Sequence, residues 1–158
     1  MSKITRSNPP HGTSLPARGR GIRHRGRGSA VMEASLALPV LLYFSMGMVE
    51  FGQYFYAKHT VQAAARDGCR QAILGTGTQS AATTAVANTM SAAGFASSGY
   101  SIVFTSTGGT VYSDISTVAA GTAIQATVSV KYGSVGVRPL GVIPANKQVI
   151  GITTMVKE

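Results

Sequence analysis

The sequence is poor in the residues from which most catalytic and metal sites are built. Its 158 residues include no tryptophan, one cysteine and five acidic residues. It has neither a nucleophile elbow nor a phosphate-binding loop, and too few carboxylates follow the apolar segment to form a catalytic pair. The histidines, His11, His24 and His59, are too far apart to meet. We therefore expect no catalytic residue, metal site, cofactor or small-molecule substrate, and no enzyme.

The single cysteine also limits covalent cross-linking. Cys69 by itself excludes an internal disulfide and a zinc site made of cysteines. We expect it to be a small packed residue of a helix, with an intermolecular disulfide as the less favoured alternative.

Positive charge is concentrated near the start of the sequence. Residues 1–28 carry seven Lys or Arg and no acid, whereas residues 29–158 carry seven against five, which leaves only +2 of the net charge of +9. Residues 29–158 therefore lack the row of basic residues that would bind the phosphate backbone of a nucleic acid. Alternating Arg and Gly in 18–28 is typical of RNA-binding tails. We favour a topological role, because positive residues beside an apolar helix hold that flank in the cytoplasm. Without apolar periodicity, residues 1–28 are expected to be unfolded in water.

A long apolar segment follows. No charged residue occurs from Ala34 to Val49, and Glu33 lies at the edge of this stretch. A helix from Ser29 to Tyr56 would extend about 42 Å, enough to span a bilayer, and no signal-peptide cleavage site follows it. The sequence predicts a single span with its carboxyl side outside the cytoplasm. Pro39 is expected to kink this helix or loosen one turn. An aromatic belt would mark the outer interface at Phe51, Tyr54, Phe55 and Tyr56.

Helical periodicity continues beyond the apolar segment. Between Phe55 and Leu74 apolar residues recur on one face, namely Phe55, Val61, Ala65, Cys69, Ala72 and Ile73, opposite polar residues spaced by four. Gly75 is expected to end this amphipathic helix. A second helix is predicted from about Ser80 to Ala93, ended by Gly94.

The remaining sequence has the pattern of strands. Tyr100–Thr107 and Thr110–Ser116 flank two glycines and predict a hairpin. Strict alternation from Ile124 to Tyr132 predicts a half-buried strand. The last segment, Lys147–Lys157, places Ile150, Ile152 and Val156 on one face. Between these strands, the apolar connection Gly133–Asn146 is expected to cover the core, with a contact surface as the alternative.

Three segments in this order support a family resemblance: RGRGSAVMEASLALPVLL at 25–42, GMVEFG at 47–52 and AAARDGCR at 63–70. Together they resemble the TadE-type pseudopilins of tight-adherence (Flp) pilus systems, and the ending 153–156 is similar to the last strand of that family. The family is related to type IV prepilins, which a prepilin peptidase cleaves in the inner membrane. The resemblance implies a cut between Gly28 and Ser29, with Glu33 as the fifth mature residue. Cys69 stands where a small residue such as alanine is typical of the family.

The resemblance also implies a partner for Glu33. Cleavage would create an α-amine on Ser29, and Glu33 would pair with this amine of a neighbouring subunit. Small residues suited to close helix contacts share one face at Ala30, Ala34 and Ala37. Glu50 is expected at the outer interface, where water reaches it, with a subunit contact as the second alternative.

The expected fold class is α+β, with a long N-terminal transmembrane and amphipathic helix packed on a small antiparallel sheet, as in pilins. Residues 1–28 would be a disordered, cleaved basic leader and 29–56 the transmembrane helix. A periplasmic helical part would follow at 57–94 and an antiparallel β domain at 95–158.

The resemblance implies a pseudopilin or minor pilin that acts in assembling or initiating a tight-adherence pilus for surface adhesion. Its expected partners are the prepilin peptidase, other pilins and pseudopilins, the inner-membrane assembly platform and membrane lipid, but not nucleic acid. It would cross the bacterial inner membrane once, with a cytoplasmic N-terminus and a periplasmic C-terminal domain, and incorporation into an extracellular pilus stays open. The alternative is a membrane-tethered extracytoplasmic binding module that is neither processed nor polymerised.

Overall fold

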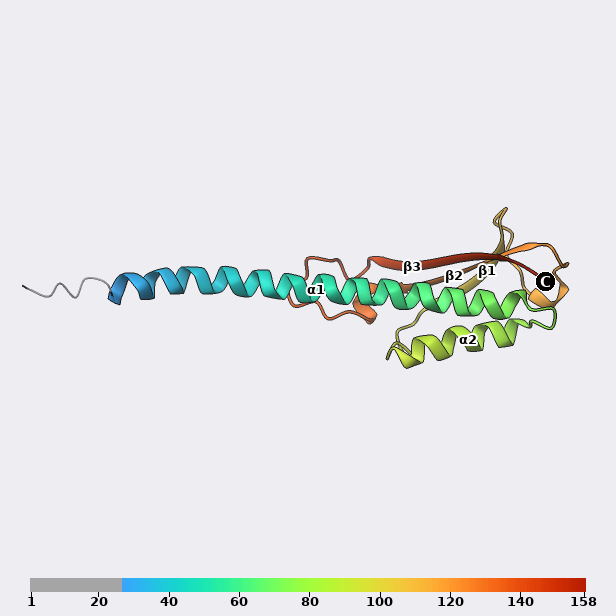
Figure 1. The fold of residues 1–158 in the computed structure, drawn as a ribbon, viewed down its shortest axis with the longest axis horizontal. Helices are drawn as coiled ribbons and strands as arrows, with labels where there is room; N and C mark the ends of the chain where they lie inside the picture. Colours follow the sequence, from blue (N-terminus) through green and yellow to red (C-terminus); the bar gives the residue numbers. More distant parts are fainter. Residues whose placement is uncertain (1–26) are drawn as a thin grey trace, which may run out of the picture. The chain divides into compact units, whose positions relative to one another are not determined.

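The computed structural model describes residues 27–158, which fold into two helices and one three-stranded antiparallel sheet (Figure 1). The predicted α+β class is confirmed, whereas the prediction that the leader is unfolded concerns residues outside this range. Residues 38–158 form one compact unit, within which the packing described below lies. In chain order the elements are α1 (Arg27–Ile73), α2 (Gln79–Ala92), β1 (Ser101–Ser106), η1 (Ile115–Thr117), β2 (Ala123–Lys131), η2 (Tyr132–Ser134) and β3 (Gln148–Val156).

Helix α1 and strand β3 approach each other closely at Gly151. A Cβ atom added to Gly151 would overlap the backbone of Val61 and would lie 2.8 Å from the Cα atom of Gln62. Only glycine allows the two backbones to approach this closely. Gly151 therefore permits the close approach of β3 to α1.

Polar side chains of α1 bind the free edge of β3. The side-chain amide of Gln62 donates to the carbonyl oxygen of Ile152 over 2.7 Å and accepts from the N–H of the same residue over 3.3 Å. The ammonium of Lys58 donates to the carbonyl of Ile150. Unpaired strand edges invite pairing with other chains, so these side chains satisfy groups that would otherwise be open.

The second helix packs on α1 through another glycine. The side-chain oxygen of Thr78 accepts from the N–H of Ala81 at the start of α2, over 3.1 Å. The helix is followed by Gly94, whose φ is +81°. A Cβ atom on Gly68 would overlap the side chain of Val86, so α1 and α2 also approach closely. The predicted second helix is confirmed.

The central strand, β2, carries the apolar face of the sheet. It pairs antiparallel with β1 on one side and β3 on the other. Its alternate residues are almost completely buried against the helices, as the period of two predicts. The prediction for this strand is confirmed at Ile124, Ala126, Val128 and Val130, and the following Tyr132 is also buried.

One strand prediction is wrong in part. The predicted hairpin partner of β1 does not form a strand, because only Val111 bridges to Thr105 before the chain turns into η1. Asp114 begins that turn by accepting hydrogen bonds from the N–H and hydroxyl of Ser116, over 2.8 and 2.7 Å. Such short local bonds compete with strand pairing.

The apolar face of β3 points outward. Gly151 and Val149 are buried, whereas Ile150, Ile152 and Val156 are exposed. The contact between Gly151 and α1 decides this orientation, since neighbouring strand residues point to opposite faces. Phe55 is likewise exposed instead of joining the buried face of α1.

Cys69 lies in the core, as predicted. Its side chain is fully buried, and its thiol donates to the carbonyl oxygen of Ile124 over 3.4 Å. Burial raises the pKa of the Cys69 thiol above its ordinary value. A buried, protonated thiol is a poor partner for a disulfide with a second chain.

The substitution Gly151→Ala tests the helix–strand contact. We expect it to lower the free energy of unfolding by about 1–3 kcal/mol, because the new methyl group meets backbone atoms that cannot rotate away. Chemical unfolding of the full chain in detergent micelles, followed by circular dichroism, measures the change. The control is Gly108→Ala, where the nearest atom would be 3.6 Å away. Equal stability of the two variants would contradict the contact.

Candidate functional site

The residues of the predicted cleavage site lie in the first turns of α1. Gly28, Ser29 and Glu33 are exposed, and a Cβ atom on Gly28 would meet nothing within 4 Å. Ser29 and Glu33 are four positions apart in one helix, so their side chains lie on the same face. The small residues Ala30, Ala34 and Ala37 are exposed too. Cleavage and subunit contact at these positions stay predictions.

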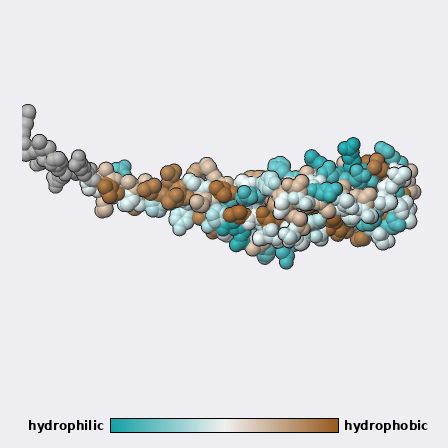
Figure 2. All heavy atoms as spheres, turned by 90° about the horizontal axis from the view of Figure 1, so that it is seen from below, coloured by the Kyte–Doolittle hydropathy of each residue, from teal (hydrophilic) through white to brown (hydrophobic). Residues whose placement is uncertain are grey.

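The N-terminal half of α1 exposes apolar side chains around its circumference. Figure 2 shows hydrophobic atoms gathered there. α1 contains one segment long and apolar enough to cross a membrane, by length and composition. Large exposed hydrophobic residues between 31 and 49 are Val31, Met32, Leu36, Leu38, Val40, Leu41, Leu42, Tyr43, Phe44, Met46, Met48 and Val49. Side chains exposed in this number need a lipid or protein environment.

The two serines of this segment form hydrogen bonds inside the helix. The hydroxyl of Ser35 donates to the carbonyl oxygen of Met32, and that of Ser45 to the carbonyl oxygen of Leu41, both over 2.8 Å. Hydrocarbon offers no alternative partner, so such internal bonds suit a helix surrounded by lipid. α1 runs through Pro39. These features fit a single-pass membrane anchor.

Glu50 does not lie in water, and this expectation is wrong. Its side chain is 0% exposed. One carboxylate oxygen accepts from the N–H of Ile143 over 2.7 Å, and the other accepts from the N–H of Leu140 over 3.1 Å. The positive charge of Arg138 also acts on this carboxylate. A buried carboxylate is tolerated when it is bonded in this way. Contact of Glu50 with another subunit would require this loop to open.

Tyr132 completes the attachment of the loop to α1. Its hydroxyl donates to the main-chain carbonyl of Glu50 over 2.9 Å, and its ring packs edge-to-face on Tyr54 with the centroids 5.4 Å apart. Burial raises the pKa of Tyr132, and the negative charge of Glu50 raises it further. The phenol therefore remains a donor at neutral pH.

The loop between η2 and β3 has two kinds of side chain. Ile143 packs on the core, as the favoured interpretation of this connection expects, whereas Val137 and Val142 are exposed. Gly141 turns the chain between the two amides that bind Glu50, with φ at +66°. Sequence reasoning missed this arrangement, because no periodicity links residue 50 to residues about ninety positions away.

The sequence from Gly28 to Arg70 is similar to a known family. Residues 28–70 match the family model described as TadE-like protein. The match lies within α1, covers less than half of the chain and confirms the resemblance found in the sequence. Comparisons with curated proteins and with solved structures gave no match. Among residues 27–158, no three His, Cys, Asp or Glu side chains are grouped to hold a metal ion.

The substitution Glu50→Gln tests the attachment of the loop. An amide has one oxygen and one NH₂ group, so one loop N–H would face a donor and lose its partner. We expect amide hydrogen exchange at Leu140 and Ile143 to accelerate by about tenfold or more, while exchange within β2 stays unchanged. Asp67→Asn, which removes an exposed carboxylate of the same helix, is the control. Unchanged exchange at both loop amides would refute the role of Glu50.

Proposed function

We propose that this chain, which is similar to TadE-like protein over residues 28–70, is a pseudopilin or minor pilin of a tight-adherence pilus. The observation that carries the proposal is that the matched segment is one helix with two environments. Its first part exposes apolar side chains, and its second part is built into the core of a folded unit. A helix of this kind can stand in a bilayer before assembly and pack on copies of itself afterwards.

Cleavage after Gly28 would allow this helix to pass from the bilayer to the assembled form. A peptidase needs access to the bond it cuts, and exposure of Gly28 and Ser29 in the structure supports such access. Removing the residues before Ser29 would also remove seven cationic side chains. Those charges favour the cytoplasmic side, so their loss makes withdrawal of the helix from the membrane less costly.

Glu33 would then guide assembly. The new α-amine of Ser29 and the carboxylate of Glu33 carry opposite charges at the edge of an apolar region, where uncompensated charge is expensive. Within a regular helix both groups remain at the same end of one subunit. We propose that the carboxylate pairs with the amine of a neighbouring subunit, while the face of Ala30, Ala34 and Ala37 lets the helices approach.

The folded unit would lie on the periplasmic side of the inner membrane. The concentration of Lys and Arg before Ser29 supports this orientation. Expected partners are the prepilin peptidase, other pilins or pseudopilins and the assembly platform. Adhesion to a surface would follow from the assembled pilus.

N-terminal sequencing of the membrane-purified chain, co-expressed with a prepilin peptidase, tests processing. We expect the sequence to start at Ser29. Gly28→Val should block the cut without preventing membrane insertion, because a branched side chain replaces the glycine before the bond. Gly52→Val, at a position with open space around the Cβ atom, should be processed normally. A wild-type chain that retains the residues before Ser29 would favour the unprocessed, membrane-tethered binding module.

Glu33→Gln separates charge from size at the proposed assembly contact. We expect the amount of the variant in pili, or the yield of pili that it supports, to fall by at least about tenfold. The reason is that an amide leaves the α-amine of the neighbouring subunit without a counter-charge. Immunoblots of sheared pili and of membranes measure this for the variant and for the control Asp67→Asn. Normal cleavage and normal pilus yield in the Glu33 variant would rule out a role for the carboxylate.

A further inference from the structure

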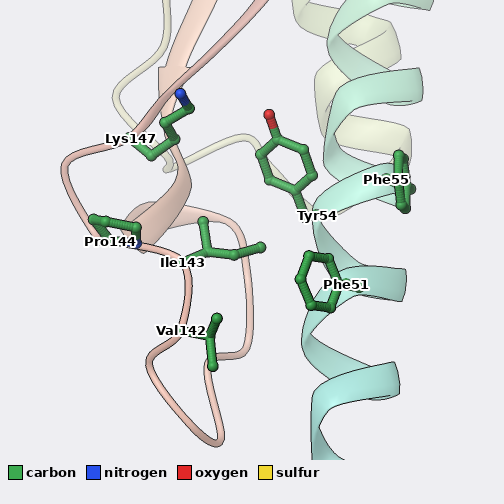
Figure 3. Close-up of a pocket in the computed structure, with 7 residues that line it drawn as sticks. All are labelled: Phe51, Tyr54, Phe55, Val142, Ile143, Pro144 and Lys147. Atoms are coloured by element: carbon green, nitrogen blue, oxygen red, sulfur yellow. The ribbon is translucent and has the colours of Figure 1, made fainter.

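A cleft lies where the apolar part of α1 meets the loop that Glu50 holds. It has a volume of about 440 Å³ and is lined by Phe51, Tyr54, Phe55, Val142, Ile143, Pro144 and Lys147. One wall is a helix face, and the other is the loop before β3 (Figure 3). All the lining side chains except Tyr54 and Lys147 are wholly apolar. The function proposed above does not use this cleft.

The two ends of the cleft differ in polarity. Figure 3 shows Val142 and Phe51 on opposite walls, toward the end closer to the apolar segment of α1. The ammonium of Lys147 and the hydroxyl of Tyr54 lie toward the opposite end. The cleft is therefore apolar toward the proposed span and cationic away from it.

Hydrogen bonds hold both walls in place. Two loop amides bind Glu50 on α1, and the carbonyl of Lys147 accepts from the N–H of Tyr132 over 2.9 Å. Tyr54 is fixed by its packing on Tyr132. Val142 is nevertheless 59% exposed, and Phe51 and Phe55 also remain open. A preformed, open apolar cleft is the usual form of a site for a small amphipathic molecule.

We propose that this cleft binds a phospholipid of the membrane leaflet next to the folded unit. The acyl chain would lie between Phe51 and Val142, and the anionic phosphate would face Lys147, with the Tyr54 hydroxyl as a donor. Two observations favour lipid as the occupant. The apolar end is continuous with the side chains of the proposed span, and the cationic end lies where a headgroup would be.

The proposal rests on the membrane anchor in the proposed function, and it adds a second contact with the bilayer. A helix alone leaves the folded unit free to tilt and rotate on the membrane surface. A lipid held between the helix and the loop would fix the face of α1 that points toward the headgroups. The chemistry of the cleft identifies the occupant as an anionic phospholipid at the bilayer surface. Aromatic and branched side chains of the cleft would surround the upper part of its acyl chain.

Depth-dependent quenching of tryptophan fluorescence tests this contact. The chain has no tryptophan, so Val142→Trp introduces a single probe into the full-length protein. The probe is reconstituted in vesicles of phosphatidylglycerol and phosphatidylcholine with bromines near the glycerol end of the acyl chains. We expect strong quenching. Val111→Trp is the control, because Val111 is similarly exposed, at 64%, in the loop after β1.

Placing the bromines on only one of the two lipids measures the headgroup preference. We expect stronger quenching of the Val142→Trp probe by brominated phosphatidylglycerol than by brominated phosphatidylcholine. Adding Lys147→Gln should reduce this preference by about fivefold, the effect of one cation beside an anionic surface. Adding Arg70→Gln, which removes an exposed cation of α1 beyond the cleft, should leave it unchanged.

The outcomes distinguish this proposal from the membrane anchor. Vesicle flotation reports insertion separately, and failure of every variant to float would overturn the anchor and the lipid site together. Normal flotation with equal quenching at positions 142 and 111 would overturn the lipid site alone. Shielding of the Val142→Trp probe by a second copy of the chain, detected by cross-linking, would also overturn it.

Discussion

The backbone contact between Gly151 and α1 constrains most of the folded unit. It brings a strand and a helix closer than side chains normally permit, and it determines which face of β3 turns inward. Because β3 pairs with β2, the same contact aligns the buried face of the central strand with the helices. The side chains of Gln62 and Lys58 then bind main-chain groups along the outer edge of β3. These groups of the edge are therefore not open to pairing with another chain. The sheet is small, but its placement on the helix is specific.

Glu50 provides the second point of attachment. Its carboxylate is removed from water, which is tolerable because two amides and the charge of Arg138 compensate for the lost hydration. As a consequence, an apolar loop is held beside the helix at the end of the exposed apolar segment. The residue that looked like a solvated interfacial acid instead organises the side of the domain nearest the proposed membrane, and it creates the wall of the cleft.

Local features of the sequence were predicted well. The extents of both helices, the alternation in β2 and the exposed apolar segment follow from periodicity, glycine positions and composition, which act between neighbouring residues. The Gly28–Glu33 segment is local too, and its resemblance to TadE-like protein is found again in the family match. Predictions failed where two patterns competed. The region after β1 has strand-forming residues, yet Asp114 and Ser116 form a turn of their own.

By itself, the sequence determined where the chain is apolar, where its helices end, which residues alternate and which segment resembles a known family. Only the tertiary structure decided that Ile150 and Ile152 point outward, that Glu50 is buried and that Lys147 stands over an apolar cleft. The physical reason is distance along the chain. A period of two in the sequence shows that the two faces of a strand differ, but it does not show which face packs on the helix. Likewise, the sequence does not show which amides a carboxylate will bind until folding brings residues 50 and 143 together.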